Sequence, residues 1–533
     1  MDIEDINKKK YSNEIINEFK SSNITNANEF IKYIRTTYKI NLSKSDLIYI
    51  YNKLNLNDIK LKQILTKKIG KSYSGIVSIS ILTDPYQKII YENGDIKTEI
   101  FTCKNNCHFC PNEIGQPRSY LKNEPAVLRA NKNNFSPKNQ IYDRFNTLLN
   151  MGHEIDKIEL IILGGTWCHH TIEYQEYFIN NIYYAINTFY EDREIKSLDE
   201  EVKINENSKI HIIGLTLETR SDSINLEEIK RLRRYGCTRV QIGCQHTNDE
   251  ILKKNNRGHG IESVKKAIKI LKNNCFKIDI HIMLNLYGSS ILHDEMMLYK
   301  ILNDEYLQCD QIKIYPCAIV PFTKIKELYE EGKYIPYDEK YLYELIKDFK
   351  NNIPKWWRIN RIIRDIPGTY IIDGYKNVNM RQKLENDKSI KCKCIRCKEI
   401  KNNKIDTNDI KLYIEKYNAS DGIEYFISYE STDYLIGFIR LRLNKNYENT
   451  LPILIDCGLI RELHVYGILS KVGDINELSM QHLHLGRKLI AKAEEIAKKN
   501  NYNKIAIISG IGVREYYRKF NYNLIDTYMI KNL

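Results

Sequence analysis

The chain has 533 residues, a length that at about 150 residues per domain predicts three or four domains. Hydrophobic residues make up 42%, which excludes a largely disordered chain, and no apolar run approaches the ~20 residues that a membrane helix needs. Lysine and arginine number 81 against 68 aspartates and glutamates, so the formal net charge of +13 favours a polyanionic partner.

Residues 1–74 are expected to form short helices separated by polar breaks, because apolar residues recur there at helical spacing. The residues that carry this pattern are Phe30, Ile31, Ile34 and Tyr38. The end of the segment is basic, through Lys60, Lys62, Lys67, Lys68 and Lys71. We interpret this face either as solvated surface or as an arm that contacts phosphates.

Residues 75–321 alternate short β-branched runs with amphipathic helical stretches. The runs are Ile76–Leu82, Ile158–Leu163, Ile210–Leu217, Arg239–Gly243, Ile278–Leu284 and Ile312–Ile319. Strand–helix units in series predict a parallel sheet with helices outside, as a partial or complete barrel. In a barrel the chemistry lies at the carboxyl ends of the strands. Polar or glycine-rich groups follow several runs there, namely Gly164-Gly165-Thr166, Glu218-Thr219-Arg220 and Gln241 to Gln245.

The last two segments differ from the barrel region. Residues 322–410 have weaker periodicity and a basic character, and we expect a barrel extension and linker there. Residues 411–533 show a compact α+β pattern that predicts a further domain. Its expected elements are strands at Tyr425–Tyr429, Leu435–Leu443, Ile460–Ile468 and Lys504–Ser509, and helices at Gly486–Lys499 and Val513–Phe520.

The 13 cysteines argue against a disulfide framework, because their number is odd and six of them fall in two tight groups. With a polar start and no secretory signal, this predicts a reducing, cytoplasmic location. The first group is Cys103, Cys107 and Cys110. Three closely spaced thiolates can hold three irons of a four-iron, four-sulfur cluster and leave the fourth iron open. A zinc knuckle that includes His108 is the alternative.

The spacing of this first group resembles the hallmark of the radical S-adenosylmethionine (SAM) superfamily. In that superfamily the open iron binds the amino and carboxylate groups of SAM, and one electron cleaves SAM to a 5′-deoxyadenosyl radical. The resemblance implies a 4Fe-4S cluster and a bound SAM. The residues that it assigns to SAM are Gly164, Gly165, Thr166, Glu218, Arg220 and Gln241.

The segment Gln481–Arg487 resembles the CoA-binding loop of the GCN5-related N-acetyltransferases. In these enzymes N–H groups at a helix N-terminus hold the CoA pyrophosphate. The resemblance implies pyrophosphate contacts from Leu485, Gly486 and Arg487, and a catalytic phenol near the CoA sulfur at Tyr516 or Tyr517. The implied strand edge for the pantetheine arm is Glu462, Leu463, His464 and Val465. His484 stands where the family has a glycine.

A radical SAM barrel followed by an acetyltransferase domain resembles the family of the Elongator catalytic subunit, which carboxymethylates the wobble uridine of tRNA. The expected fold class is α/β, with a partial (βα)6-type barrel, an α+β acetyltransferase domain and a small helical N-terminal segment. The stretches that carry the resemblance include Asp156–Glu159, Tyr235–Arg239, Asn256–His259, Arg364–Pro367, Arg461–Gly467 and Tyr516–Lys519.

The resemblance implies a tRNA uridine(34) acetyltransferase with acetyl-CoA as co-substrate. The radical takes a hydrogen from the acetyl methyl group, and the methyl carbon adds to C5 of the wobble uridine. Thioester hydrolysis then leaves 5-carboxymethyluridine and CoA. Lys157 is implied as a residue that touches acetyl-CoA across the domain boundary. The implied partners are the tRNA anticodon stem-loop and either Elongator-like subunits or a second copy of the chain, without a membrane.

The second cysteine group is Cys392, Cys394 and Cys397, and the resemblance implies a structural zinc there. Zinc takes four ligands, and the sequence does not identify the fourth. Reduced thiols in a basic loop are the alternative. Two other functions remain open at this point: a protein lysine acetyltransferase with a structural or regulatory cluster, and an inactive tRNA-binding scaffold.

Overall fold

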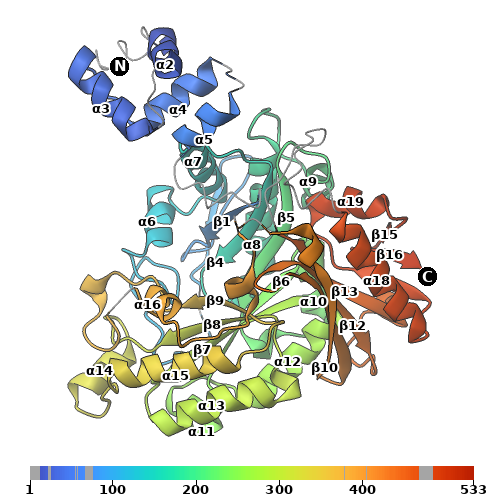
Figure 1. The fold of residues 1–533 in the computed structure, drawn as a ribbon. Helices are drawn as coiled ribbons and strands as arrows, with labels where there is room; N and C mark the ends of the chain where they lie inside the picture. Colours follow the sequence, from blue (N-terminus) through green and yellow to red (C-terminus); the bar gives the residue numbers. More distant parts are fainter. Residues whose placement is uncertain are drawn as a thin grey trace.

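The computed structural model describes residues 12–21, 26–54, 56, 58–66, 76–101, 103–376, 379–401, 403, 405–466 and 484–533. Figure 1 shows three parts: a group of N-terminal helices, a central parallel sheet covered by helices, and a C-terminal sheet with its own helices. No helix among these residues is long and apolar enough to cross a membrane.

Four short helices make up the N-terminal part: α2 (Ser12–Ser21), α3 (Ala27–Tyr38), α4 (Lys44–Lys53) and α5 (Ile59–Leu65). Phe30 and Ile34 are buried in a small apolar core of this part, as their helical spacing predicts, whereas Tyr38 is exposed. An ion pair from Lys62 to Glu154 ties the part to the barrel. The predicted basic residues at 67, 68 and 71 lie outside the described residues.

The central sheet has seven parallel strands in the order β1-β4-β5-β6-β7-β8-β9. They are β1 (Ile76–Leu82), β4 (Lys157–Leu163), β5 (His211–Thr219), β6 (Arg239–Gln245), β7 (Lys277–Leu284), β8 (Gln311–Pro316) and β9 (Arg358–Ile362). Six strands were predicted. The seventh, β9, lies in the expected extension, where its charged residues mask the apolar signal. Since β1 and β9 are the two edges, the barrel is partial.

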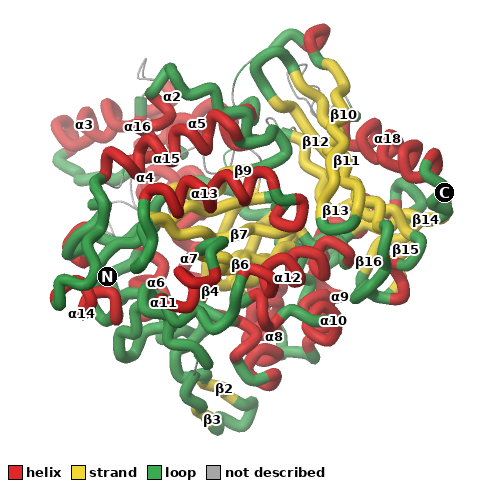
Figure 2. The backbone as a smooth tube through the Cα atoms, turned by 90° about the horizontal axis from the view of Figure 1, so that it is seen from below, coloured by secondary structure: helices red, strands yellow, loops and turns green. Residues whose placement is uncertain are grey.

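Helices cover the outer face of this sheet (Figure 2). The helices of this part of the chain are α6 (Pro125–Lys132), α7 (Pro137–Leu149), α8 (Ile172–Asn187), α9 (Leu198–Asn205), α10 (Leu226–Arg234), α11 (Asp249–Lys254), α12 (Ile261–Asn273), α13 (Ile291–Asn303), α14 (Lys324–Glu330), α15 (Glu339–Asn352), α16 (Met380–Asn386) and α17 (Ile395–Lys398). A hairpin of β2 (Lys88–Ile90) and β3 (Ile96–Thr98) projects from the sheet before the first cysteines. The alternation of strands and helices therefore has the predicted α/β order.

The C-terminal sheet has the order β10-β11-β12-β13-β14-β16-β15. Its strands are β10 (Lys411–Ala419), β11 (Gly422–Glu430), β12 (Leu435–Asn444), β13 (Cys457–Val465), β14 (Lys504–Ile507), β15 (Asn523–Ile525) and β16 (Tyr528–Asn532), with helices α18 (Leu485–Lys499) and α19 (Arg514–Arg518). The expected elements are present. β13 ends at Val465, three residues before the predicted end, and Ile468 lies outside the described residues.

The C-terminal sheet packs against the amino ends of the barrel strands. Gly510 lies so close to the start of β5 that an added Cβ would be 2.1 Å from the carbonyl oxygen of Ile213. Gly512 approaches His211 in the same way, with a Cβ at 2.3 Å from that side chain. The cysteine loop lies at the opposite, carboxyl ends of the strands. The cysteine loop and the C-terminal sheet are therefore at opposite ends of one partial barrel.

Candidate active site

The first cysteine group lies in a loop at the carboxyl ends of the strands. Cys103 Sγ is 3.9 Å from Thr166 Oγ1, and Arg257 Nη1 is 3.7 Å from Cys107 Sγ. These contacts join the loop to the turn after β4 and to the segment between α11 and α12. The three sulfurs do not form a group within 4.8 Å of one another. In a four-iron cluster each thiolate binds a different iron, so this wider separation fits a cluster better than one metal ion.

The Cys103 thiol has an environment that favours the thiolate. Burial alone raises its pKa, but hydrogen bonds from His169 and the Asn105 backbone and the charge of His169 outweigh burial and lower the pKa to about 7. The thiolate is the form of cysteine that binds metal. At Cys110 burial prevails and raises the pKa. A metal centre with positive charge would favour thiolates at both positions.

The glycine turn after β4 needs its glycines. Gly164 has φ +134 and a Cβ there would lie 1.9 Å from Thr83 Oγ1, while Gly165 has φ +96 and a Cβ would lie 3.0 Å from the Arg118 carbonyl oxygen. Such backbone conformations are open mainly to glycine. The turn thus presents bare backbone beside the cysteine loop, and Thr166 contacts Cys103 directly. This geometry fits the contact with the SAM amino group that the resemblance implies.

The other three residues assigned to SAM occupy two different places. Arg220 follows β5 and is buried, with one N–H donating to the Arg257 carbonyl oxygen at 2.8 Å, so it lies beside the cysteine loop. Glu218 and Gln241 are paired across β5 and β6 and point into the barrel lumen. Tyr120 donates to Glu218 at 3.0 Å, and burial raises the pKa of Glu218.

A single cavity of about 1060 Å³ runs along the lumen. Near the cysteine loop its walls include Phe109, Pro111 and Tyr120, and at the other end they include Glu462 and His464 of β13. Between these ends, polar side chains of the barrel strands line it in layers: Glu159, Glu218, Arg239, Gln241, Lys277, His281, Gln311, Lys313, Tyr315 and Asn360. The cavity therefore reaches from the cysteine loop to the C-terminal sheet.

The amino-end wall of the cavity is a strand edge of β13 that, within the described part of the chain, has no neighbouring strand paired to it. β13 and β14 pair from Cys457–Lys504 to Ile460–Ile507, and one further bond joins Ile508 N to the Ile460 carbonyl oxygen. β13 continues to Val465, paired with β12 only on its other side. The two strands thus diverge beside the predicted pantetheine edge of Glu462, Leu463, His464 and Val465. An extended ligand can pair with an open strand edge of this kind.

The start of α18 lies next to this edge. Leu485 is buried, Gly486 is half-buried and Arg487 is exposed, while Gln481 and His482 of the predicted loop lie outside the described residues. A Cβ on Gly486 would lie 2.6 Å from Tyr516 Oη and 3.9 Å from Val465. His484 has φ +50, the left-handed conformation that glycine adopts at no cost. The backbone at position 484 therefore has the conformation that the glycine of the family would adopt.

The predicted catalytic residues separate in the structure. Tyr517 is buried and lines the cavity, and burial raises the pKa of its phenol. Tyr516 is more exposed and packs over Gly486 instead. Lys157 begins β4 on the same face as Glu159, at the amino-end mouth, and it pairs with Asp156 at 3.1 Å. Its side chain is half-buried and is not among the residues that line the cavity.

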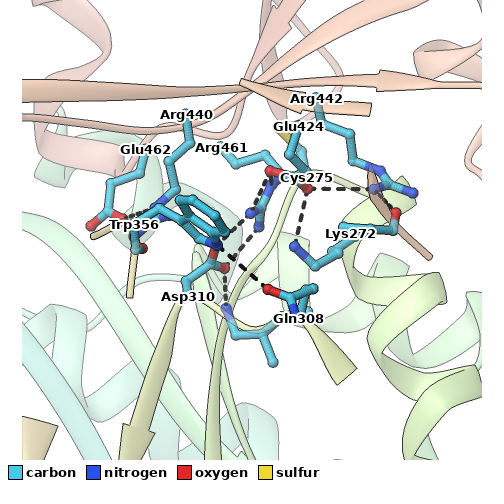
Figure 3. A network of polar contacts seen from close by, with 12 residues as sticks. Lys272, Cys275, Gln308, Asp310, Trp356, Glu424, Arg440, Arg442, Arg461 and Glu462 are labelled. Carbon is cyan, nitrogen blue, oxygen red and sulfur yellow. Dashed lines mark hydrogen bonds and ion pairs between the residues drawn. The ribbon is translucent and has the colours of Figure 1, made fainter. Parts of the chain in front are cut away.

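A buried charge network joins the two domains (Figure 3). Arg461 Nη1 donates to Asp310 Oδ2 at 2.8 Å, and Arg461 Nη2 donates to Glu424 at 2.9 Å. Lys272 of α12 also donates to Glu424, at 3.1 Å. Burial alone raises the pKa of Asp310, but Arg461, Lys272 and Arg440 outweigh it and hold that pKa well below its usual range. The network fixes β11–β13 over the amino end of the barrel.

The second cysteine group also lies between the domains. Cys392, Cys394 and Cys397 place their sulfurs within 4.8 Å of one another. A tetrahedral zinc with Zn–S bonds of about 2.3 Å holds its sulfurs about 3.8 Å apart, so the three thiols fit one zinc ion. No fourth cysteine, histidine or carboxylate joins this group among the described residues, although Lys350 lies 3.5 Å from Cys397. Glu399 forms a bridge to Leu435 of β12, which places the site at the domain boundary.

Sequence reasoning missed most of the polar lumen. His281 and Lys313 line the cavity, and Lys313 donates to Gln241 at 2.7 Å and lies 4.0 Å from the buried Asp279. Burial lowers the pKa of His281 well below its usual value, so this imidazole is neutral at neutral pH. The signal was present: parallel strands buried on both faces are normally apolar throughout, whereas β7 alternates polar and apolar residues.

Comparison with known proteins gives the class first. The family model described as "Radical SAM superfamily" matches residues 100–297, and the model described as "Radical_SAM C-terminal domain" matches residues 309–390. With the parallel half-barrel and its cysteine loop, these matches define the protein as a radical SAM enzyme.

Full-length relatives then give the family. The chain is 39% identical over 490 residues to the tRNA uridine(34) acetyltransferase of Methanocaldococcus infernus, covering 88% of each. It is 32% identical over 503 residues to Elongator complex protein 3 of Homo sapiens, covering 91% of this chain and 88% of that one. The solved archaeal Methanocaldococcus infernus Elp3 with an N-terminal deletion has a TM-score of 0.73 and 37% identity, and covers 86% of this chain and 100% of that one. The chain belongs to the family of the tRNA uridine(34) acetyltransferases and Elongator complex proteins 3.

Proposed function

We propose that this enzyme forms 5-carboxymethyluridine at the wobble position of tRNA, with acetyl-CoA as the source of the carboxymethyl group. The observation that carries the proposal is the continuous cavity of about 1060 Å³ between the cysteine loop and β13. The carboxyl end of the cavity suits radical generation, and the amino end suits acetyl-CoA binding. One lumen open to both ends lets the acyl group and the radical-generating centre meet, which two separate pockets would prevent.

At the carboxyl end, Cys103, Cys107 and Cys110 would hold the four-iron cluster, and the Gly164-Gly165-Thr166 turn would contact SAM. When bound, the cluster and SAM supply a carbon radical that can take a hydrogen atom from the acetyl methyl group. The chain itself provides the bare backbone at Gly165 and the buried Arg220 beside the cysteines. Glu218 and Gln241 face the lumen further in, where they suit the uridine as well as SAM.

At the amino end, the start of α18 would hold the CoA pyrophosphate, and the open edge of β13 would pair with the pantetheine arm. Tyr517 lines the cavity beside this edge, which favours it over Tyr516 as the phenol near the CoA sulfur. Lys157 at the amino-end mouth would contact acetyl-CoA from the barrel side. The acetyl methyl carbon would bond to C5 of the uridine, the C5 hydrogen would leave as a proton, and one electron would return to the oxidised cluster. Water would then hydrolyse the thioester and release CoA.

The charge of the cavity suits a nucleic acid. Its lining holds eleven lysines and arginines against six aspartates and glutamates. Phosphate contacts dominate nucleic-acid affinity, and a base presented from a single-stranded loop can enter a pocket. We therefore propose the tRNA anticodon stem-loop as the partner. Assembly with Elongator-like subunits or a second copy is proposed from the names of the relatives alone.

The second cysteine group is proposed as a structural zinc site that fixes the barrel extension against β12. None of the 13 cysteines forms a disulfide, which supports a reducing compartment such as the cytoplasm.

The experiment that tests the function is nucleoside mass spectrometry of tRNA after incubation with reconstituted protein, SAM, acetyl-CoA and a reductant. We expect 5-carboxymethyluridine only when all components are present. Acetyl-CoA hydrolysis that needs tRNA separates this function from its rivals. A protein lysine acetyltransferase would consume acetyl-CoA with peptides and without SAM, and a scaffold would consume none.

A further inference from the structure

Lys277 is a lysine of the cavity wall. It begins β7 on the lumen face, and it lines the cavity together with Glu462 and His464. No hydrogen bond or ion pair joins its ammonium group to another side chain in the described part of the chain. The other lumen cations differ: Arg239 pairs with Glu159, and Lys313 donates to Gln241.

The acidic groups around Lys277 are already engaged by arginines. Glu159 on β4 pairs with Arg239 on β6, and Glu462 on β13 accepts from Arg440 on β12 at 2.9 Å. Asp310, just before β8, accepts from Arg461 at 2.8 Å. Lys277 is therefore a surplus cation.

Burial lowers the pKa of Lys277, and the charge of Arg239 lowers it further against the opposing effect of Glu462 and Glu159. A shielded ammonium without an acceptor is costly, and the cost falls when a ligand brings an oxygen.

The geometry of β13 indicates which ligand atom reaches Lys277. Val465 lies beside Gly486 at the start of α18, where the pyrophosphate is proposed to bind. Glu462 is three residues back along β13, and at about 3.3 Å per residue this spans about 10 Å. An arm held at α18 and lying along β13 therefore points its far end into the lumen at Glu462. The far end of an acyl-CoA arm is the thioester.

We propose that Lys277 binds the carbonyl oxygen of the acyl thioester and stabilises the negative charge that develops there during hydrolysis. In that step the oxygen of water bonds to the carbonyl carbon and the C–S bond breaks. The electron pair leaves with the CoA sulfur, and the protons of water pass to that sulfur and to solvent. An ammonium group aimed at such an oxygen acts as a preorganised donor. This inference rests on the acetyl-CoA site of the proposed function.

Calorimetric titration with two ligands tests the proposal. Wild type, Lys277→Met, Lys277→Gln and Lys277→Arg are titrated with acetyl-CoA and with CoA, which lacks the carbonyl, in the presence of a tRNA anticodon stem-loop. We expect the Met and Gln variants to lose roughly tenfold or more in acetyl-CoA affinity, as for removal of a charge-assisted hydrogen bond, with CoA affinity unchanged. The Arg variant should recover most of the loss. Lys504→Met, at the exposed start of β14, is the matched control and should change neither affinity.

The possible results separate this inference from the function on which it rests. Equal losses for both ligands in folded variants, or no loss for either, would assign Lys277 a structural role and overturn the proposal. Wild type that binds neither ligand would remove the CoA site itself, and the inference with it. Wild type that binds both, with a loss confined to acetyl-CoA and reversed by arginine, would support it, and tRNA-dependent hydrolysis should fall in parallel.

Discussion

Asp310 and Arg461 form a buried ion pair across the boundary between the barrel and the C-terminal sheet. Asp310 precedes β8, and Arg461 lies on β13 directly before Glu462, the first residue of the open strand edge. Figure 3 shows the pair at the centre of the network that also includes Glu424 and Lys272. The ion pair therefore holds the two domains in one relative position. That position determines where the open edge of β13 faces the lumen.

Arg461→Met should destabilise the protein strongly. The change leaves Asp310 and Glu424 with buried carboxylates that have lost their shared guanidinium. Removing one partner of a buried ion pair costs roughly 3–5 kcal/mol. Urea unfolding followed by circular dichroism would measure the loss. Lys209→Met, which removes an exposed pair with Glu191, is the control and should cost less than about 1 kcal/mol. Equal effects of the two changes would contradict this account of the network.

Stability should fall as the solution becomes mildly acidic. Burial lowers the pKa of His464 to about 4, and burial followed by the charge of Arg257 lowers that of His259 to about 4. An unfolded histidine titrates near pH ~6.5, so between about pH 6.5 and 4 the unfolded chain binds more protons than the folded one. Stability is thus fully present above this window and is lost as the pH falls through it.

Urea midpoints at about pH 7.5 and about pH 5 would check this expectation. His464→Gln should reduce the difference between the two midpoints, because the variant has one fewer group to protonate on unfolding. A difference that is unchanged in His464→Gln would mean that the ring titrates normally in the folded protein.

The order of the helices and strands could be predicted from the sequence, but the contacts between side chains of different strands could not. Six barrel strands and the helices between them were predictable, because each carries its own apolar pattern. β9 was missed, since Arg358 and Arg361 break that pattern while it pairs with β8. The surplus charge on Lys277 was also beyond sequence reasoning, because it depends on arginines from β6, β12 and β13 that meet only in the folded chain.

The two cysteine groups should bind different metals. After anaerobic reconstitution we expect about four irons and four sulfides per chain, lost when Cys103, Cys107 and Cys110 are replaced by alanine. The variant with alanine at Cys392, Cys394 and Cys397 should keep its iron and lose about one zinc. Each triple variant is the control for the other, and metal analysis with visible absorption reads both. Zinc at the first group, with no iron taken up by wild type, would contradict the assignment.

The N-terminal helices should contribute to tRNA affinity through phosphate contacts. Deletion of residues 1–73 should weaken binding and flatten its salt dependence by about one unit of slope for each lost contact. Lys62 is already paired with Glu154, so other lysines of the segment should account for the change. Filter binding over a range of salt concentrations measures both quantities. An unchanged affinity and slope would return the segment to the solvated-surface interpretation.

The last prediction concerns the residue before α18. His484 has φ +50, and its side chain is exposed rather than packed against the helix start. A non-glycine residue in this conformation costs of order 1 kcal/mol, but its backbone N–H points as a glycine N–H would. We therefore expect His484→Gly to change acetyl-CoA affinity only modestly. Gly486→Trp should abolish binding, because even a Cβ there lies 2.6 Å from the Tyr516 hydroxyl and a ring would fill the space beside Val465.

Calorimetric titration of wild type and the two variants with acetyl-CoA, in the presence of tRNA, decides whether the site tolerates His484 or whether His484 blocks acetyl-CoA binding. Tolerance predicts binding by wild type and His484→Gly and none by Gly486→Trp. Obstruction predicts that wild type binds nothing and that His484→Gly gains binding. Since Leu485 is buried and holds the helix start in place whichever residue precedes it, the geometry favours tolerance. Binding gained only in His484→Gly would refute acetyl-CoA as the co-substrate and leave the tRNA-binding scaffold as the function of this chain.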